Sequence, residues 1–296
     1  MDVFKLSVHS STIYSITNCS DFEILTSKQK PWVDYEFTAT GRRTRHYAVC
    51  PHCNNTIVMV GFNAGSKLKT PYGKHYLSRE LLHLGYRDQD AYDACPYHLK
   101  GQSSFSPDDK YLSDNPHCIE RLSKLIEHFD IVIDIIQKNV GVQFSRNCIE
   151  KMLTAYRASE GWLYKGASEQ NIPWSFAYLT LSESLYGQTI HHQELREALL
   201  ENTPGLHFEH DRLVPQKGIY FNAMFCFLDH QRMVVKHHLR ESLIFSVVTP
   251  DRETLYQKEI VWETADFDSY IKQNVGEERR NDLVKLAREY LGFLLQ

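Results

Sequence analysis

Two segments, Cys50-Pro51-His52-Cys53 and Cys95-Pro96-Tyr97-His98, decide the fold that we expect for this 296-residue chain. Each segment places two potential metal ligands three residues apart, around a proline-containing turn. Zn²⁺ takes four cysteine or histidine ligands in a tetrahedron, and this spacing lets both side chains of a pair reach one ion. The two segments together supply one complete ligand set. Such a set leaves no position for water, so it indicates a structural zinc site rather than metal catalysis.

The identity of the fourth zinc ligand stays open at the level of sequence. Cys50, Cys53 and Cys95 are the three expected sulfur ligands, and His98 is the expected fourth ligand. Cys118 follows closely in the chain and is an alternative to His98, which would make a four-cysteine site. The interval between the two segments is longer than that of the commonest zinc fingers. A set of unrelated cysteines and histidines is therefore the competing interpretation.

The other cysteines and the apolar segments bear on the compartment of the protein. Seven cysteines without a secretory signal favour a reducing compartment, where cysteines bind metals rather than form disulfides. Cys19, Cys148 and Cys226 have apolar neighbours in the sequence, and we expect them to be inert core residues. No apolar run approaches the ~20 residues that a membrane-spanning helix needs. We therefore expect a soluble, cytoplasmic protein.

Charge is distributed unevenly along the chain. The formal net charge is −4, but residues 1–101 carry 12 lysines and arginines against 9 acids, and the remainder carries 21 against 28. No acidic residue occurs between Glu36 and Glu80. That window holds seven cations: Arg42, Arg43, Arg45, Lys67, Lys69, Lys74 and Arg79. Cations without counter-charges are suited to binding phosphate.

The acid-free window therefore supplies the expected nucleic-acid contacts. Residues 63–74 form a Gly- and Pro-containing loop by composition, and its small residues would let a backbone approach a ligand closely. Tyr72 adds a surface for stacking. The alternative is an ordinary solvated basic face. The residues that we expect to contact nucleic acid are Arg42, Arg43, Arg45, Lys67, Lys69, Tyr72 and Lys74.

The pattern of apolar residues changes along the chain and predicts an α+β protein. Residues 1–62 favour short strands, including 22–25, and a strand on each side of Cys50–Cys53 gives the hairpin of a zinc ribbon. After residue 117, apolar residues recur at helical spacing. We expect a β-rich zinc-binding domain over 1–116 and a mainly helical domain over 117–296. The expected helices are 119–140, 145–158, 173–186, a helix capped by Thr189 that ends before Pro204, 266–275 and 278–295.

Residues 173–218 outline a winged helix within the helical part. The order is helix, tight turn at Gly187, helix, and a hairpin over 206–214. The second helix of such a pair usually docks on DNA. Here it carries Glu194 and Glu197, which suits a major groove poorly, so a scaffold or protein contact is the favoured interpretation. Residues 219–227 and 233–248 are apolar and fit either a helix or a strand.

A zinc-ribbon domain with an acid-free basic window, followed by a helical part, resembles the large subunit of type IV CRISPR–Cas effector complexes. The match covers the layout of the chain and the motif from Cys50-Pro51-His52-Cys53 to Cys95. The family has a four-cysteine finger, so His98 would be a departure from it. The resemblance implies a non-enzymatic, antiviral ribonucleoprotein subunit that recognises the flanking motif (PAM) in double-stranded target DNA. The implied partners are guide RNA, other effector subunits and, as a further candidate, a helicase.

Two other classes of function remain open. One is a transcription regulator built from a zinc ribbon and a winged helix, which would need a basic recognition helix. The other is a zinc-dependent hydrolase, which would need an open metal position and a nearby base. The sequence contains no Gly-rich phosphate loop, no Gly-x-Ser-x-Gly segment and no His-Glu-x-x-His segment.

Overall fold

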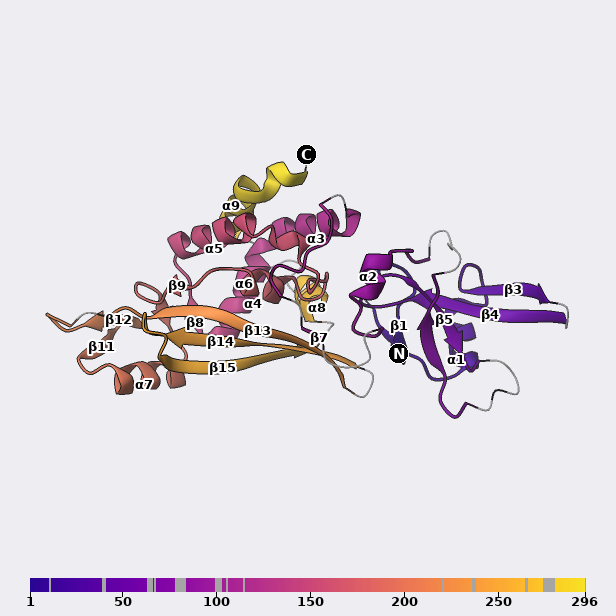
Figure 1. The fold of residues 1–296 in the computed structure, drawn as a ribbon, viewed down its shortest axis with the longest axis horizontal. Coiled ribbons are helices and arrows are strands. Elements are labelled where there is room, and N and C mark those ends of the chain that lie inside the picture. The colour runs from indigo at the N-terminus through magenta and orange to yellow at the C-terminus, as the bar shows by residue number, and fades with distance from the viewer. Residues whose placement is uncertain are drawn as a thin grey trace. The chain divides into compact units, whose positions relative to one another are not determined.

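The computed structural model is an α+β fold with several antiparallel sheets, as expected for its class (Figure 1). It describes the chain except residues 11, 39–40, 63–65, 67, 78–83, 99–102, 105, 114, 220, 236–237, 264–265, 274–279 and 296. Within these described residues, no helix has the length and apolar character needed to cross a membrane.

The chain divides into two compact units. Unit 1 comprises Met1–Ser103 and Arg232–Arg240, and unit 2 comprises Ser104–Gln231 and Glu241–Gln296. The division thus lies at Ser103 rather than at the expected residue 116. A short return of the chain to unit 1 interrupts unit 2. That return lies between two paired strands of unit 2. The local sequence of residues 232–240 does not predict that these residues belong to unit 1.

Unit 1 is built around a four-stranded sheet of order β3-β4-β5-β6. Strand β4 pairs with β3 over Val33–Thr38 and then with β5, so one long strand joins the two halves of the sheet. The elements of unit 1 are β1 (Val3–Phe4), β2 (Tyr14–Ser15), α1 (Cys19–Thr26), β3 (Val33–Thr38), β4 (Gly41–Val49), β5 (Thr56–Val60), β6 (Tyr72–His75) and α2 (Gln89–Asp93).

Helix α1 corrects the strand expected over residues 22–25. Asn18 precedes the helix, and its side chain accepts a hydrogen bond from the Asp21 amide, which satisfies one of the free amides of the first turn. Ser27 ends the helix in a left-handed conformation. Phe22 is buried and packs on Phe4 and Phe62, whereas Ile24 and Leu25, which also suggested a strand, are exposed on the helix.

Unit 2 contains more β-structure than the expected helical domain. The apolar segments at 219–227 and 233–248 form long strands, in a sheet of order β15-β14-β13-β7 with β9 paired to β13. Burial alternates along β14, as in a strand, but apolar Ile244 and Val248 lie on the less buried face and obscure this period in the sequence. The strands that lie wholly or partly in unit 2 are β7 (Ser103–Ser104), β8 (Val142–Gln143), β9 (Glu183–Ser184), β10 (Thr189–Ile190), β11 (Leu206–Glu209), β12 (Arg212–Pro215), β13 (Met224–Val235), β14 (His238–Val248) and β15 (Thr254–Glu263).

The helices of unit 2 follow the expected positions in most places. The helix expected over 119–140 is divided at His128, and its second part ends at Gly141 in the left-handed region, with φ 68°. Ser145 caps the next helix through its side chain, as expected. The helices are α3 (Pro116–Glu127), α4 (Phe129–Val140), α5 (Arg146–Ala158), α6 (Ile172–Tyr178), α7 (Gln193–Asn202), α8 (Asp266–Gln273) and α9 (Asn281–Leu291), with 3₁₀ turns at Gly161–Leu163 and Gly292–Leu295.

The winged-helix outline is present only in its second half. Helix α6 ends at Tyr178, shorter than expected, and α7 is capped by His192 rather than by Thr189, which lies in β10. The hairpin of β11 and β12 follows α7 as expected. Together with β10 and β8 it forms a four-stranded sheet.

A buried polar network lies where β13 and β14 leave unit 2. His230 and Glu241 flank the residues that belong to unit 1, and the His230 Nε2 to Glu241 Oε2 distance is 3.0 Å. The Asn171 amide donates to the same carboxylate at 2.7 Å, and the Tyr164 hydroxyl lies 3.1 Å from His230 Nδ1. Both side chains of the pair are essentially inaccessible to water. Buried polar groups of this kind must keep their partners to be tolerated.

We predict that His230→Phe destabilises unit 2 by about 3–5 kcal/mol, because it leaves the buried Glu241 carboxylate without its imidazole partner. Urea unfolding followed by tryptophan fluorescence measures this, since Trp162, Trp174 and Trp262 all lie in unit 2. Exposed His191 provides the control, and His191→Phe should change stability little. Equal stability of the two variants would contradict a structural role for the network.

Candidate metal centre

The first cysteine pair lies at the tip of the β4–β5 hairpin. Tyr47, Ala48 and Val49 pair with β5 in antiparallel register up to the turn. Within the turn, the Cys50 amide donates to Asn55 at 2.9 Å, and the Asn54 amide donates back to Cys50 at 3.2 Å. Asn54 has φ 58°, a left-handed conformation that asparagine tolerates. This is the hairpin expected for a zinc ribbon, and it buries both Cys50 and Cys53.

Asn55 connects the first turn to the segment that carries Cys95. Its side-chain amide donates to the Asp88 carbonyl at 2.9 Å, and its side-chain oxygen accepts from the Asp88 amide at 2.7 Å. Asp88 in turn caps α2 by accepting from Ala91. Gly85 permits this approach, because a Cβ there would lie 2.7 Å from the Thr56 backbone nitrogen. The short helix α2 is thereby held with Cys95 just beyond its end.

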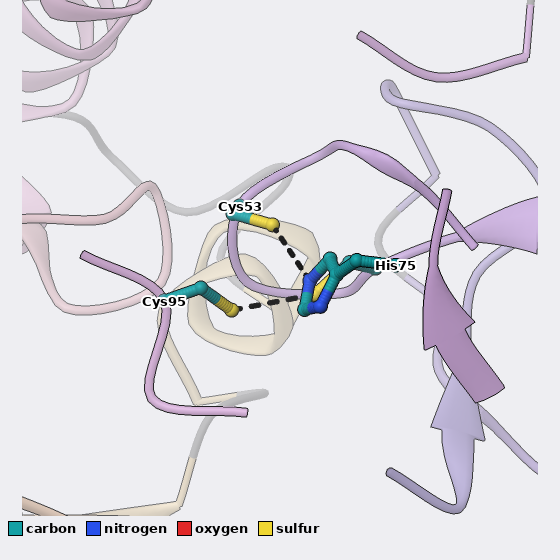
Figure 2. A group of neighbouring side chains, drawn as sticks. Cys53, His75 and Cys95 are labelled. Atoms are coloured by element: carbon teal, nitrogen blue, oxygen red, sulfur yellow. Dashed lines mark hydrogen bonds between the residues drawn. The ribbon is translucent and has the colours of Figure 1, made fainter. Parts of the chain in front are cut away.

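The fourth member of the cluster is His75, which comes from strand β6. The register of β5 and β6 places His75 opposite Ile57, one residue pair from the first turn. Its Nε2 lies 3.2 Å from the Cys53 sulfur, and the Cys50 and Cys95 sulfurs lie 3.8 Å apart. All four ligand atoms lie within 4.8 Å of one another. Figure 2 shows the sulfurs of Cys53 and Cys95 directed toward the His75 imidazole.

These separations suit a tetrahedral metal ion. With Zn–S bonds of about 2.3 Å and Zn–N bonds of about 2.0 Å, tetrahedral geometry puts two sulfurs about 3.8 Å apart and a sulfur and a nitrogen about 3.5 Å apart. The observed 3.8 Å and 3.2 Å lie close to these values. The cluster of Cys50, Cys53, His75 and Cys95 is able to hold a metal ion and is compatible with zinc.

The electrostatics of the cluster also favour a cation. Burial, reinforced by the neighbouring Cys50, raises the pKa of the Cys53 and Cys95 thiols well above the ordinary value. Burial acts on Cys50 as well, but hydrogen bonds with Cys53, Cys95 and His75 lower its pKa well below the ordinary value. A divalent cation would supply the charge that three adjacent thiolates require.

The structure corrects the expected fourth ligand. His98 stacks on Tyr92, with ring centroids 3.9 Å apart, and Tyr92 meets the edge of His75 at 5.1 Å. His98 therefore lies one layer outside the ligands and supports the ring that packs against His75. The alternative ligand, Cys118, belongs to α3 in unit 2, where its sulfur accepts a hydrogen bond from Arg121 at 3.1 Å.

Local spacing could not identify His75. It lies 22 residues after Cys53, in a segment that reads as a loop, and it reaches the cluster only because β6 pairs with β5. In the structure, burial alternates along β6, since Tyr72 and Lys74 are exposed while Gly73 is buried. That pattern identifies a strand whose next inward residue is His75.

The tip of the β13–β14 hairpin contacts both cysteine turns within unit 1. Arg232 is fully buried, and its guanidinium donates to the imidazole of His52, in the first turn. The backbone of Leu239 hydrogen-bonds Tyr97, in the second turn, and burial raises the pKa of that tyrosine. Neither His52 nor Tyr97 belongs to the metal cluster. Both residues instead join the two turns to the hairpin.

The expected nucleic-acid residues lie on opposite faces of the sheet of unit 1. Residues paired across a ladder share a face, so Arg43 and Arg45 lie on the face of Glu36 and Asp34. Arg45 forms an ion pair with Glu36 at 2.9 Å. The acids that the window lacks are therefore supplied by the neighbouring strand β3.

The remaining expected residues that the structure describes are exposed. Arg42 lies on the opposite face, with its guanidinium carbon 3.6 Å from the ring centroid of Tyr35. Tyr72 and Lys74 project from the edge strand β6, on the face of Arg43, and Lys69 is exposed just before it. Tyr72 and Lys74 thus belong to a strand rather than to the expected loop. Lys67 and Arg79 lie outside the described residues.

Comparison of the chain with protein-family models, with curated proteins and with solved structures found no match.

We predict that His75→Ala lowers the zinc content of the purified protein by one ion per chain, because it removes one of four ligands from a closed site. His98→Ala should retain that ion, since its ring stacks on Tyr92 outside the ligand set. Inductively coupled plasma mass spectrometry of protein dialysed against zinc-free buffer gives the ratio. Loss of the ion in the His98 variant but not in the His75 variant would refute the ligand set.

Proposed function

We propose that this protein is a non-enzymatic large subunit of a type IV CRISPR effector complex, in which unit 1 contacts the duplex DNA that flanks the target. The resemblance of the sequence motivates the proposal, and features of unit 1 support it. A metal centre with four protein ligands leaves no coordination position for water or substrate, which favours a structural role. In RNA-guided recognition, the guide reads the target by base pairing and the protein reads a short flanking motif.

Zn²⁺ is the ion that we propose for the centre. Three thiolates and one imidazole in a closed tetrahedral arrangement are a typical structural zinc set. Soft sulfur ligands also disfavour Mg²⁺ and Ca²⁺, which bind oxygen. The ion would hold β4, β5, β6 and the end of α2 together, so that the exposed strands of the same sheet become a rigid binding surface.

The observation that carries the proposal is the exposed surface formed by Tyr35, Phe37 and Arg42, here called the hairpin surface. These residues share one face of the β3–β4 hairpin, because Phe37 pairs directly with Arg42. The Phe37 side chain is 86% exposed, which is unusual for a large apolar residue. Proteins that open or kink duplex DNA insert apolar side chains between base steps and place cations on the adjacent phosphates. Phe37 would be such a wedge, and Arg42 the adjacent cation.

Unit 2 would provide contacts with other subunits. Residues 102–296 carry 28 acids against 21 lysines and arginines, which disfavours contact with nucleic acid. Helix α7 presents Glu194 and Glu197 to solvent. In a stand-alone transcription regulator, this helix would dock on DNA. The two carboxylates would repel the phosphates, so a basic protein is the partner that we expect for the helix.

We predict that the double variant Phe37→Ala with Arg42→Ala weakens binding of the assembled complex to duplex DNA. The logarithm of the binding constant falls as the logarithm of the salt concentration rises. Loss of one phosphate contact should make this negative slope shallower by about 0.9. Binding titrations at four or more salt concentrations measure both quantities. Exposed Lys217 in unit 2 gives a charge-matched control, and Lys217→Ala should leave the slope unchanged.

A second pair, Lys69→Ala with Lys74→Ala, tests the opposite face of the sheet in the same titrations. Uniform weakening over all flanking sequences would assign phosphate contacts, and loss of sequence preference would assign base contacts. Unchanged affinity and slope in both double variants would mean that neither face binds DNA, and the proposed function would fall.

We also predict that Glu194→Lys with Glu197→Lys reduces the amount of guide RNA and partner subunits that co-purify with the protein. The reversal replaces two negative charges by two positive charges, which would repel a basic partner. The matched control reverses Asp251 and Glu253, which are exposed in the turn before β15. Normal assembly together with tighter DNA binding by the α7 variant would favour the regulator instead.

A further inference from the structure

A second group of potential ligands lies in unit 1, outside the four-ligand centre. It consists of Cys19 and Glu23 from α1 and His46 from β4, whose ligand atoms all lie within 4.8 Å of one another. Cys19 and Glu23 are four residues apart and so project from one face of the helix. That face meets β4, because His46 Nε2 lies 3.5 Å from the Cys19 sulfur and 3.0 Å from Glu23 Oε1.

Hydrogen bonds do not satisfy all three of these ligand atoms at once. A single imidazole nitrogen carries either one proton or one lone pair, so it can serve one of its two neighbours well. Here Nε2 of His46 is shared between a sulfur and a carboxylate oxygen. A cation would accept a lone pair from all three atoms at once.

The separations also suit a metal ion. The 3.5 Å between Cys19 and His46 equals the sulfur–nitrogen separation of about 3.5 Å in tetrahedral zinc. The 3.0 Å between His46 and Glu23 is slightly below the nitrogen–oxygen separation of about 3.3 Å that Zn–N and Zn–O bonds give. Small side-chain rotations within one helix turn would accommodate the difference.

The surroundings hold the imidazole in place. The rings of Phe22 and Phe62 meet His46 edge-on, at centroid distances of 5.8 Å and 5.4 Å. The His46 side chain is 4% exposed, whereas that of Glu23 is 21% exposed. On the other carboxylate oxygen, Lys28 lies 2.9 Å from Glu23 and orients it. Partners of this kind fix the orientation of metal ligands.

We propose that Cys19, Glu23 and His46 form a second divalent transition-metal site, with zinc as the expected ion and with solvent as its fourth ligand. The sequence favours a buried apolar setting for Cys19, but the structure places it beside a carboxylate and an imidazole. The ion would fasten α1 to β4, as the first centre fastens the end of α2 to the hairpin. The two sites border one core, since Phe22 contacts His46 and belongs to the same buried cluster as Cys50.

The second site binds more weakly than the first. It offers one thiolate against three, and Lys28 places a positive charge next to one of its ligands. Its fourth position is open to water, so a chelator reaches this ion more easily. Stepwise addition of chelator should therefore remove the Cys19 ion before the Cys50 ion.

The test is the zinc content of the full-length protein after loading with Zn²⁺ and dialysis. We expect two ions per chain in the parent and one in both Cys19→Ser and Glu23→Gln. Glu23→Gln retains the shape of the side chain, so it guards against a failure of Cys19→Ser to fold. Cys148, buried in α5 of unit 2, gives the control, and Cys148→Ser should keep two ions.

Two results would overturn the site. The first is a single ion in the parent that is lost in His75→Ala and kept in Cys19→Ser. This result would mean that only the first centre binds a metal ion. The second is two ions in the parent and in both Cys19→Ser and Glu23→Gln. Substitution with Co²⁺ gives an independent reading, because loss of one thiolate in Cys19→Ser should weaken the sulfur-to-cobalt charge-transfer band without abolishing it.

Discussion

Three sulfurs and one imidazole nitrogen meet at one point in unit 1, and the local structure of that unit depends on their convergence. The ligands come from three separate segments: the β4–β5 turn, strand β6 and the chain after α2. A metal ion bound there would contribute free energy to folding, because the unfolded chain has no such site. Burial raises the pKa of the Cys53 and Cys95 thiols, so a cation would favour their thiolate forms. The geometry and the chemistry therefore favour the same occupant.

Local spacing predicted those features of unit 1 that depend on neighbours in sequence. Cys50 and Cys53, on one turn, were identified, and so was the hairpin around them. His75 was not, because its approach depends on strand pairing, and His98 was chosen because it is near Cys95 in sequence. Helix α1 was missed for a related reason. Of its apolar residues, Phe22 is buried while Ile24 and Leu25 are exposed, so the short segment carries no helical period in its sequence.

Charge along the sequence was a poor guide to charge in space. The acid-free window suggested seven uncompensated cations, yet Arg45 meets Glu36 across the ladder and Arg43 shares their face. Strand alternation then separates Arg42 from these residues and groups it with Tyr35 and Phe37. Arg42 therefore lies on the face opposite Arg43, Arg45 and Lys74, so these cations do not form one continuous basic surface. A prediction from composition could not have separated the two faces, because it did not use the register.

Residues 232–240 of β13 and β14 connect the two cysteine turns of unit 1 to a third segment of the chain. The two strands belong to the sheet of unit 2, while this segment lies in unit 1 and contacts His52 and Tyr97 in the two cysteine turns. A fully buried arginine is costly unless hydrogen bonds hold it, so Arg232 requires His52 in place. The first turn holds His52 in place only while Cys50 and Cys53 remain fixed. The hydrogen bonds between Arg232 and His52 therefore depend on the conformation of the first cysteine turn.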